Sequence, residues 1–79
     1  MKGNKMKYEP FTKLLELRKQ RGLTRDELAE MSLLSPMTIT ALETGVNNYR
    51  EAKLSTLLAL CDALECKLID LFPNEKNIA

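Results

Sequence analysis

The side chains that most often carry out catalysis or bind metals are sparse in this chain. Its 79 residues include no histidine and two cysteines, Cys61 and Cys66. Zinc requires about four ligands, so this chain alone does not supply a zinc site. The first ten residues lack the apolar stretch of a secretory signal, and we therefore expect two buried thiols rather than a disulfide. We expect no metal and no cofactor.

Carboxylates are more numerous, but their spacing favours helix capping over catalysis. Thr24 is followed three residues later by Glu27, which is the pattern of a capping box. Asp26 and Glu30 lie in the same short segment, where negative charge stabilises the positive end of a helix dipole. The chain also has no glycine-rich phosphate loop. These observations argue against an enzyme.

Positive charge is concentrated at one end of a nearly neutral chain. The formal net charge is +1. Residues 1–22 contain seven basic side chains against two acidic ones, whereas residues 23–50 and 51–79 each have a net charge of −2. We expect residues 1–9, with Lys2, Lys5 and Lys7, to form a flexible basic arm.

The segment from Thr24 to Gly45 carries the clearest structural pattern. Helices are predicted over 25–31 and 36–44, the second capped by Ser35 and started by a proline at its first position. Glycine at the end of the second helix fits a left-handed C-terminal residue. Two short helices joined by a tight turn leave one face of the second helix exposed, which is typical of a helix-turn-helix.

Three more amphipathic segments complete the predicted fold. The apolar spacing indicates helices before Gly22, from residue 54 to 64, and from 68 to 72, with a loop over 46–53. There is neither a strand pattern nor a membrane-length apolar run. We predict an all-α bundle of five short helices in residues 10–72, followed by a short tail over 73–79.

These motifs resemble the Cro/repressor-type (Xre-like) helix-turn-helix family over roughly residues 10–72. The resemblance rests on LLELRKQRGLT, DELAEMS, the third-helix residues Ile39, Leu42, Glu43 and Gly45, and LSTLLALCDALECKLIDLF. The last two helices look most like small phage- and plasmid-type members, and the length and the EMSLLS turn are similar to restriction–modification controller proteins. The resemblance implies a lambda-repressor-like DNA-binding domain. It also implies a sequence-specific transcriptional regulator. We expect a cytoplasmic protein because the chain shows neither a secretory signal nor a membrane-length apolar run.

The resemblance assigns the DNA-facing residues. The third helix would lie in the major groove, with its base-facing positions at Pro36, Met37, Thr40 and Ala41. Proline replaces the usual Gln or Arg at the first of these, so bidentate hydrogen bonds to a base are lost there. Specificity would then depend more on DNA shape, water or dimer spacing. Expected phosphate contacts are Arg25, Thr38, Thr44, Asn47, Asn48, Tyr49 and Arg50. The lysines of the arm either follow the DNA backbone or act only as a solubilising tail.

Two positions raise structural alternatives. Arg18 lies on the apolar face of the first helix, and the resemblance places it opposite Glu43 as an ion pair; the alternative is that each side chain reaches water separately. Leu33 occupies the turn position where the family usually has glycine. Either it bears the strain of a positive φ, or the turn is reshaped and Leu33 and Leu34 enter the core.

A homodimer on a two-fold symmetric operator is the expected assembly, since one 9 kDa module buries little DNA surface. The expected dimer surface is the fifth helix, with Leu68, Ile69 and Phe72, and the tail as far as Ile78. The alternative function is a protein-interaction module of the same fold: an anti-repressor, antitoxin or repressor partner with weak or no DNA binding. The near-neutral charge and the Pro-Met start of the third helix favour that alternative. We expect no membrane association and no small-molecule ligand, and another regulatory protein is a further candidate partner.

Overall fold

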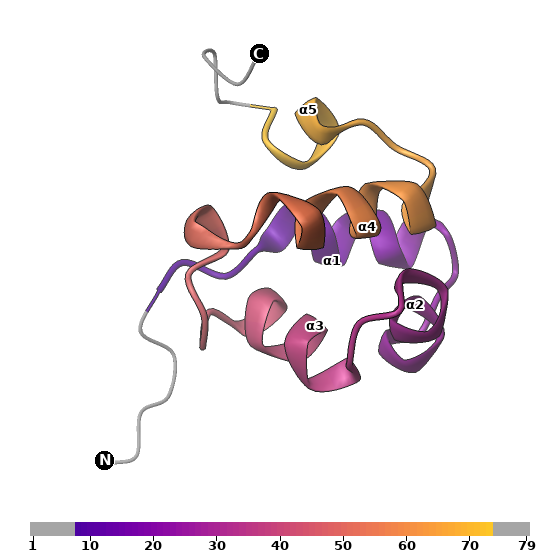
Figure 1. Cartoon of the computed structure of the whole chain (residues 1–79), viewed down its shortest axis with the longest axis horizontal. Helices are drawn as coiled ribbons and strands as arrows, with labels where there is room; N and C mark the ends of the chain where they lie inside the picture. The colour runs from indigo at the N-terminus through magenta and orange to yellow at the C-terminus, as the bar shows by residue number, and fades with distance from the viewer. Residues whose placement is uncertain (1–7, 74–79) are drawn as a thin grey trace.

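The computed structural model describes residues 8–73, which form five α-helices and one short 3₁₀ turn (Figure 1). The α-helices are α1 (Thr12–Gln20), α2 (Arg25–Ser32), α3 (Pro36–Thr44), α4 (Leu54–Leu64) and α5 (Leu68–Leu71). The 3₁₀ turn η1 (Tyr49–Glu51) interrupts the segment predicted as a loop. These residues contain no strand, and the predicted all-α fold is confirmed.

The helices pack around one shared core. α2 contacts both α3 and α4, while α1 contacts α3 and α5, and α5 also contacts α4. Figure 1 shows α5 on one side of α1 and α4, with the α2–α3 pair on the other side. The largest fully buried side chains come from every α-helix and from the residue before α1: Phe11, Leu14, Leu28, Ile39, Leu60, Leu64 and Leu71. One face of α3 therefore packs against the core, and its opposite face lies outside the core.

An aromatic cluster joins the two ends of the domain. The rings of Phe11 and Tyr49 stack at 4.1 Å between centroids, and Phe72 lies 5.5 Å from Phe11 and 5.8 Å from Tyr49. Phe72 is 8% exposed. The structure therefore corrects its expected place at a dimer surface: Phe72 is a core residue that fastens the end of α5 to the start of α1.

The helix ends use the expected capping residues. Thr24 and Glu27 form a reciprocal capping box at the start of α2, and Ser35 accepts a hydrogen bond from the backbone N–H of Thr38 at the start of α3. Gly45 ends α3 with a φ of 87°. Leu33 ends α2 with a φ of 62° and is 91% exposed, so it bears the strain, whereas Leu34 packs against the core.

The two cysteines belong to the end of α4. The N–H of Cys66 donates to the carbonyl of Cys61 at 2.9 Å, and Glu65 between them has a φ of 55°. This is a Schellman motif with the two cysteines as its apolar contact. Both are free thiols, and Cys61 is buried. Burial, with the neighbouring Cys66 thiol, raises the pKa of Cys61 to about 12.

Every helix in residues 8–73 is too short or too polar to cross a bilayer.

Candidate nucleic-acid interface

The outward face of α3 is the surface that its packing leaves open. Ile39, Leu42 and Glu43 point inward and are at most 3% exposed. Among the expected base-facing residues, Pro36 and Met37 are exposed, the latter by 79%, while Thr40 and Ala41 are half-buried. The outer face thus begins with an apolar tip and offers one hydroxyl a turn later.

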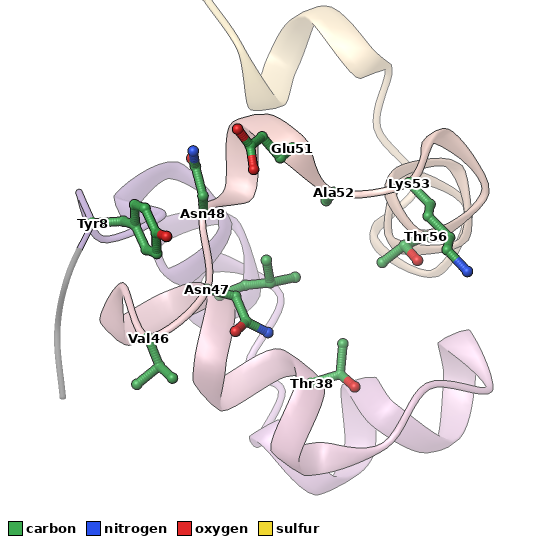
Figure 2. A pocket seen from close by; sticks show the side chains of 10 residues that line it. Tyr8, Thr38, Val46, Asn47, Asn48, Glu51, Ala52, Lys53 and Thr56 are labelled. Atoms are coloured by element: carbon green, nitrogen blue, oxygen red, sulfur yellow. The ribbon is translucent and has the colours of Figure 1, made fainter.

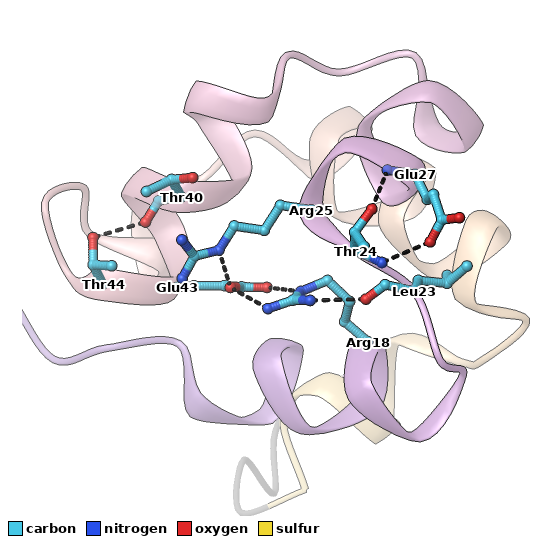
Figure 3. Close-up of polar contacts among 8 residues, drawn as sticks. All are labelled: Arg18, Leu23, Thr24, Arg25, Glu27, Thr40, Glu43 and Thr44. Atoms are coloured by element: carbon cyan, nitrogen blue, oxygen red, sulfur yellow. Dashed lines mark hydrogen bonds and ion pairs between the residues drawn. The ribbon is translucent and has the colours of Figure 1, made fainter.

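An ion-pair network ties α3 to α1 and α2. Arg18 makes a two-point contact with Glu43: its Nε donates to Oε2 at 2.7 Å and its Nη2 to Oε1 at 3.1 Å. Arg18 Nη1 also donates to the carbonyl of Leu23 at 2.8 Å. Arg25 Nε donates to Glu43 Oε1 at 2.8 Å (Figure 3). The expected contact between Arg18 and Glu43 is present, and Glu43 has a second cation that the sequence did not predict.

The network keeps Glu43 ionised inside the protein. Its side chain is 1% exposed, and burial alone would raise the pKa of Glu43. Hydrogen bonds from Arg18 and Arg25, and the positive charges of both, outweigh burial and lower that pKa below its ordinary value. One negative charge is matched by two positive charges, so the cluster has a net charge of +1.

Polar side chains also line a hollow on the other side of α3. The hollow has a volume of about 780 Å³ and lies between α3, the connection to α4 and the first turn of α4. Figure 2 shows Thr38, Asn47, Lys53 and Thr56 around it. Thr38 Oγ1 also lies 2.9 Å from Ser35 Oγ, and Thr44 Oγ1 donates to the carbonyl of Thr40 at 2.7 Å. Lys53 and Thr56 were not among the residues expected from the sequence; the available signal was their place at the N-cap and in the first turn of an amphipathic helix that follows a polar loop.

The chain is similar in sequence and fold to known helix-turn-helix proteins. The sequence profile of the helix-turn-helix family matches residues 14–71. The chain belongs to the helix-turn-helix family. It is 32% identical to the restriction-modification controller protein C.AhdI from Aeromonas hydrophila, with 78% of this chain and 89% of that one covered and a TM-score of 0.72. It is likewise 32% identical to the clp gene regulator ClgR from C. glutamicum, covering 80% and 78% at a TM-score of 0.70. An HTH_3 family transcriptional regulator from Vibrio cholerae is 27% identical at a TM-score of 0.74; the match covers 89% of this chain and 38% of that one. The comparison with curated proteins gave no match.

Within the helix-turn-helix domain, one expected phosphate contact has a different role. The Tyr49 ring is 9% exposed and stacked in the aromatic cluster, and its hydroxyl lies 3.5 Å from Glu9 Oε1. Arg50 lies over the same ring at 5.2 Å and 3.6 Å from Glu9. Asn48 accepts a hydrogen bond from the Arg50 N–H and so caps η1. Tyr49 is therefore a scaffold residue, while Asn47, Asn48 and Arg50 stay at or near the surface.

The expected dimer surface is only partly exposed. Ile69 is 44% exposed, but Leu68 is half-buried against the core and Phe72 is inside it. On α4, Leu54 and Leu58 are also exposed, by 58% and 50%. Lys2, Lys5, Lys7 and Ile78 lie outside the described residues. Within those residues, no three His, Cys, Asp or Glu side chains are grouped to hold a metal.

Proposed function

We propose that this DNA-binding transcriptional regulator acts as a homodimer on a two-fold symmetric operator, with the outward face of α3 in the major groove. The observation that carries the proposal is the placement of candidate phosphate contacts on both sides of that face. Arg25 lies on one side, at the start of α2, and the hollow with Thr38 and Asn47 lies on the other. A recognition helix flanked in this way can be held in a groove by both edges.

The reading surface predicts modest discrimination by direct base contacts. Thr40 offers a hydroxyl, and Met37 and Ala41 offer apolar contact to thymine methyl groups. Pro36 has no side-chain donor or acceptor. We therefore propose that DNA shape and the spacing of the two half-sites, one helical turn or about 34 Å apart, supply much of the specificity.

The dimer surface is proposed to centre on Ile69, with the exposed part of Leu68 beside it. We further propose that the N-terminal lysines follow the DNA backbone, because Tyr8 is hydrogen-bonded to Gly45 at the end of α3 at 3.0 Å. A regulatory, non-enzymatic role in the cytoplasm fits a chain whose matched relatives are regulators.

Fluorescence anisotropy with a labelled mixed-sequence duplex tests the DNA-binding proposal. Affinity should fall steeply with rising KCl, with a slope of about −0.9 in log–log form for each phosphate contacted. Absence of binding to any duplex at low salt would contradict it.

Sedimentation of Ile69→Lys tests the dimer: we expect monomers, while Leu58→Lys, at a similarly exposed position, should remain dimeric. The opposite result would move the interface to α4.

A protein-interaction module is the second candidate function, and one observation favours it. Met31, Leu33 and Met37 are 53%, 91% and 79% exposed at the α2–α3 turn. Exposed apolar side chains gathered at one place often mark a protein-binding surface. Replacing Met31 and Leu33 with serine separates the two functions, because neither residue is a proposed DNA contact: the variant should keep the salt-dependent binding of mixed-sequence DNA and lose partner binding.

A further inference from the structure

Arg25 has an arrangement that charge pairing alone does not explain. Arg18 already matches the charge of Glu43 through two hydrogen bonds, at 2.7 and 3.1 Å. Arg25 Nε nevertheless donates a hydrogen bond to the same carboxylate at 2.8 Å, although the Arg25 side chain is 40% exposed. A half-exposed arginine does not need a buried carboxylate for its own solvation, so the contact constrains where the guanidinium lies.

The contact leaves one edge of the guanidinium pointing away from Glu43. Arginine has five N–H donors in a planar fork, and only the Nε donor of Arg25 is directed to Glu43 in this network. Its two terminal nitrogens form the edge that fits two oxygens of a phosphate. Since Arg18 compensates Glu43, the positive charge of Arg25 is not cancelled.

Cationic side chains also gather around the start of α2. A shallow hollow of about 550 Å³ lies between the end of α1 and the first turn of α2, and Arg25 and Lys19 both line it. Its remaining lining residues are Arg18, Gly22, Leu23, Thr24 and Asp26. Arg18, Lys19 and Arg25 thus place three cationic side chains at this hollow, and Asp26 supplies one carboxylate.

We propose that Glu43 is a positioning residue for DNA binding: it holds Arg25 by Nε so that the terminal nitrogens, which are not directed to Glu43, contact a backbone phosphate. This inference rests on the proposed DNA-binding function. The negative charge of Glu43 by itself repels DNA. In this proposal Glu43 nevertheless strengthens DNA binding, because it positions Arg25.

The sign of the effect of Glu43→Gln provides the test. Removing a negative charge should tighten binding to a polyanion if the charge alone matters. If Glu43 positions Arg25, the same substitution should weaken binding roughly tenfold, and we expect the same loss for Arg25→Ala. In the Arg25→Ala background, Glu43→Gln should then cause no further loss. Each variant is measured by anisotropy against a labelled 30-base-pair mixed-sequence duplex over a KCl series, and circular dichroism confirms that it is folded.

A second variant keeps the test decisive if Glu43→Gln does not fold. Arg25→Lys conserves the charge, but a single ammonium lacks the two edges that engage Glu43 and phosphate together. We expect weaker binding and a salt slope shallower by about 0.9. Lys13→Gln, which removes a cation paired with Glu16 on α1, is the matched control and should leave the slope unchanged.

The outcomes separate the two proposals. A wild-type protein that binds no duplex at low salt contradicts the proposed function. A wild-type protein that binds, with Glu43→Gln tightening binding or Arg25→Lys leaving it unchanged, contradicts the positioning role alone.

Discussion

Replacing Gly45 with alanine should destabilise the domain through two separable effects. Gly45 has a φ of 87°, a backbone conformation that residues with a side chain rarely adopt. A Cβ there would lie 2.3 Å from the carbonyl oxygen of Tyr8 and 3.2 Å from its carbonyl carbon. Both atoms belong to the backbone, so a side-chain rotation cannot relieve the clash. The segment before α1 must move, and the hydrogen bond from Tyr8 N–H to the Gly45 carbonyl at 3.0 Å is then lost.

The expected magnitude follows from adding the two effects. A left-handed alanine costs about 1–2 kcal/mol, and the lost hydrogen bond adds about 1 kcal/mol. Together they lower the free energy of unfolding by about 2–3 kcal/mol. For a domain of this length, each kcal/mol shifts the melting temperature by roughly 4–8 °C, so the melting temperature should fall by about 8–24 °C.

Gly22→Ala is the matched control, because it imposes the strain without the clash. Gly22 has a φ of 70°, and a Cβ added there meets nothing within 4 Å. We expect this variant to lose only the strain energy of about 1–2 kcal/mol. Urea denaturation followed by circular dichroism measures both variants. If Gly45→Ala costs no more than Gly22→Ala, the close approach of Tyr8 to the end of α3 is refuted.

Four further predictions concern Leu33, the ion-pair network around Glu43 and the Cys61 thiol. Leu33→Gly should raise the free energy of unfolding by about 0.5–1 kcal/mol in urea denaturation, because relief of the left-handed strain exceeds the entropy cost of glycine; a loss of stability would contradict it. Arg18→Ala should cost about 3–5 kcal/mol, since it breaks a buried ion pair, whereas Arg25→Ala should cost about 1 kcal/mol or less; equal melting temperatures would refute the division of roles. The pKa of Glu43 is lower in the folded than in the unfolded chain, so its stabilising contribution should be present above the ordinary carboxyl pKa of about 4.3 and be lost as the pH falls towards the folded pKa. Thermal melts of wild type and Glu43→Gln over that range should converge at low pH. The Cys61 thiol should resist iodoacetamide at pH 8 until urea unfolds the protein, because its pKa is raised to about 12; rapid labelling of Cys61 in a native Cys66→Ser variant would contradict its burial.

The elements that sequence reasoning predicted are those whose signals are local. Thr24 with Glu27, and Ser35 with Pro36, specify helix starts within four residues, and the structure contains both caps. The buried face of α3 follows from the spacing of Ile39 and Leu42 along one helix. Local chemistry therefore sufficed for the scaffold of the helix-turn-helix.

The residues that sequence reasoning misjudged depend on partners far away in the chain. Tyr49 has a polar hydroxyl and lies in a segment predicted as a loop, yet its ring stacks on Phe11, 38 residues earlier. Phe72 is buried for the same reason, through contacts with both rings. Arg25 was expected to face only DNA, and its contact with Glu43 depends on the angle at which α2 meets α3. No local pattern records such an angle.

Leu33 is the position where two local principles compete. The turn requires a positive φ, which glycine accepts at no cost, and the sequence supplies leucine. Exposure of 91% shows that the side chain gains little burial in return. The fold tolerates the strain because packing of α2 and α3 fixes the turn on both sides.

The central proposal is that the two α3 helices of a homodimer contact the two half-sites of an operator. Selection of bound duplexes from a pool of randomised sequence tests it most directly. We expect enrichment of a two-fold symmetric sequence whose half-site centres are about 34 Å apart. With Thr40→Ala, the preference should relax at one position in each half-site while overall affinity for mixed-sequence DNA stays the same. A pool that remains random after selection, or a Thr40→Ala variant that selects the same sequence as the wild type, would contradict the assignment of α3 as the reading helix.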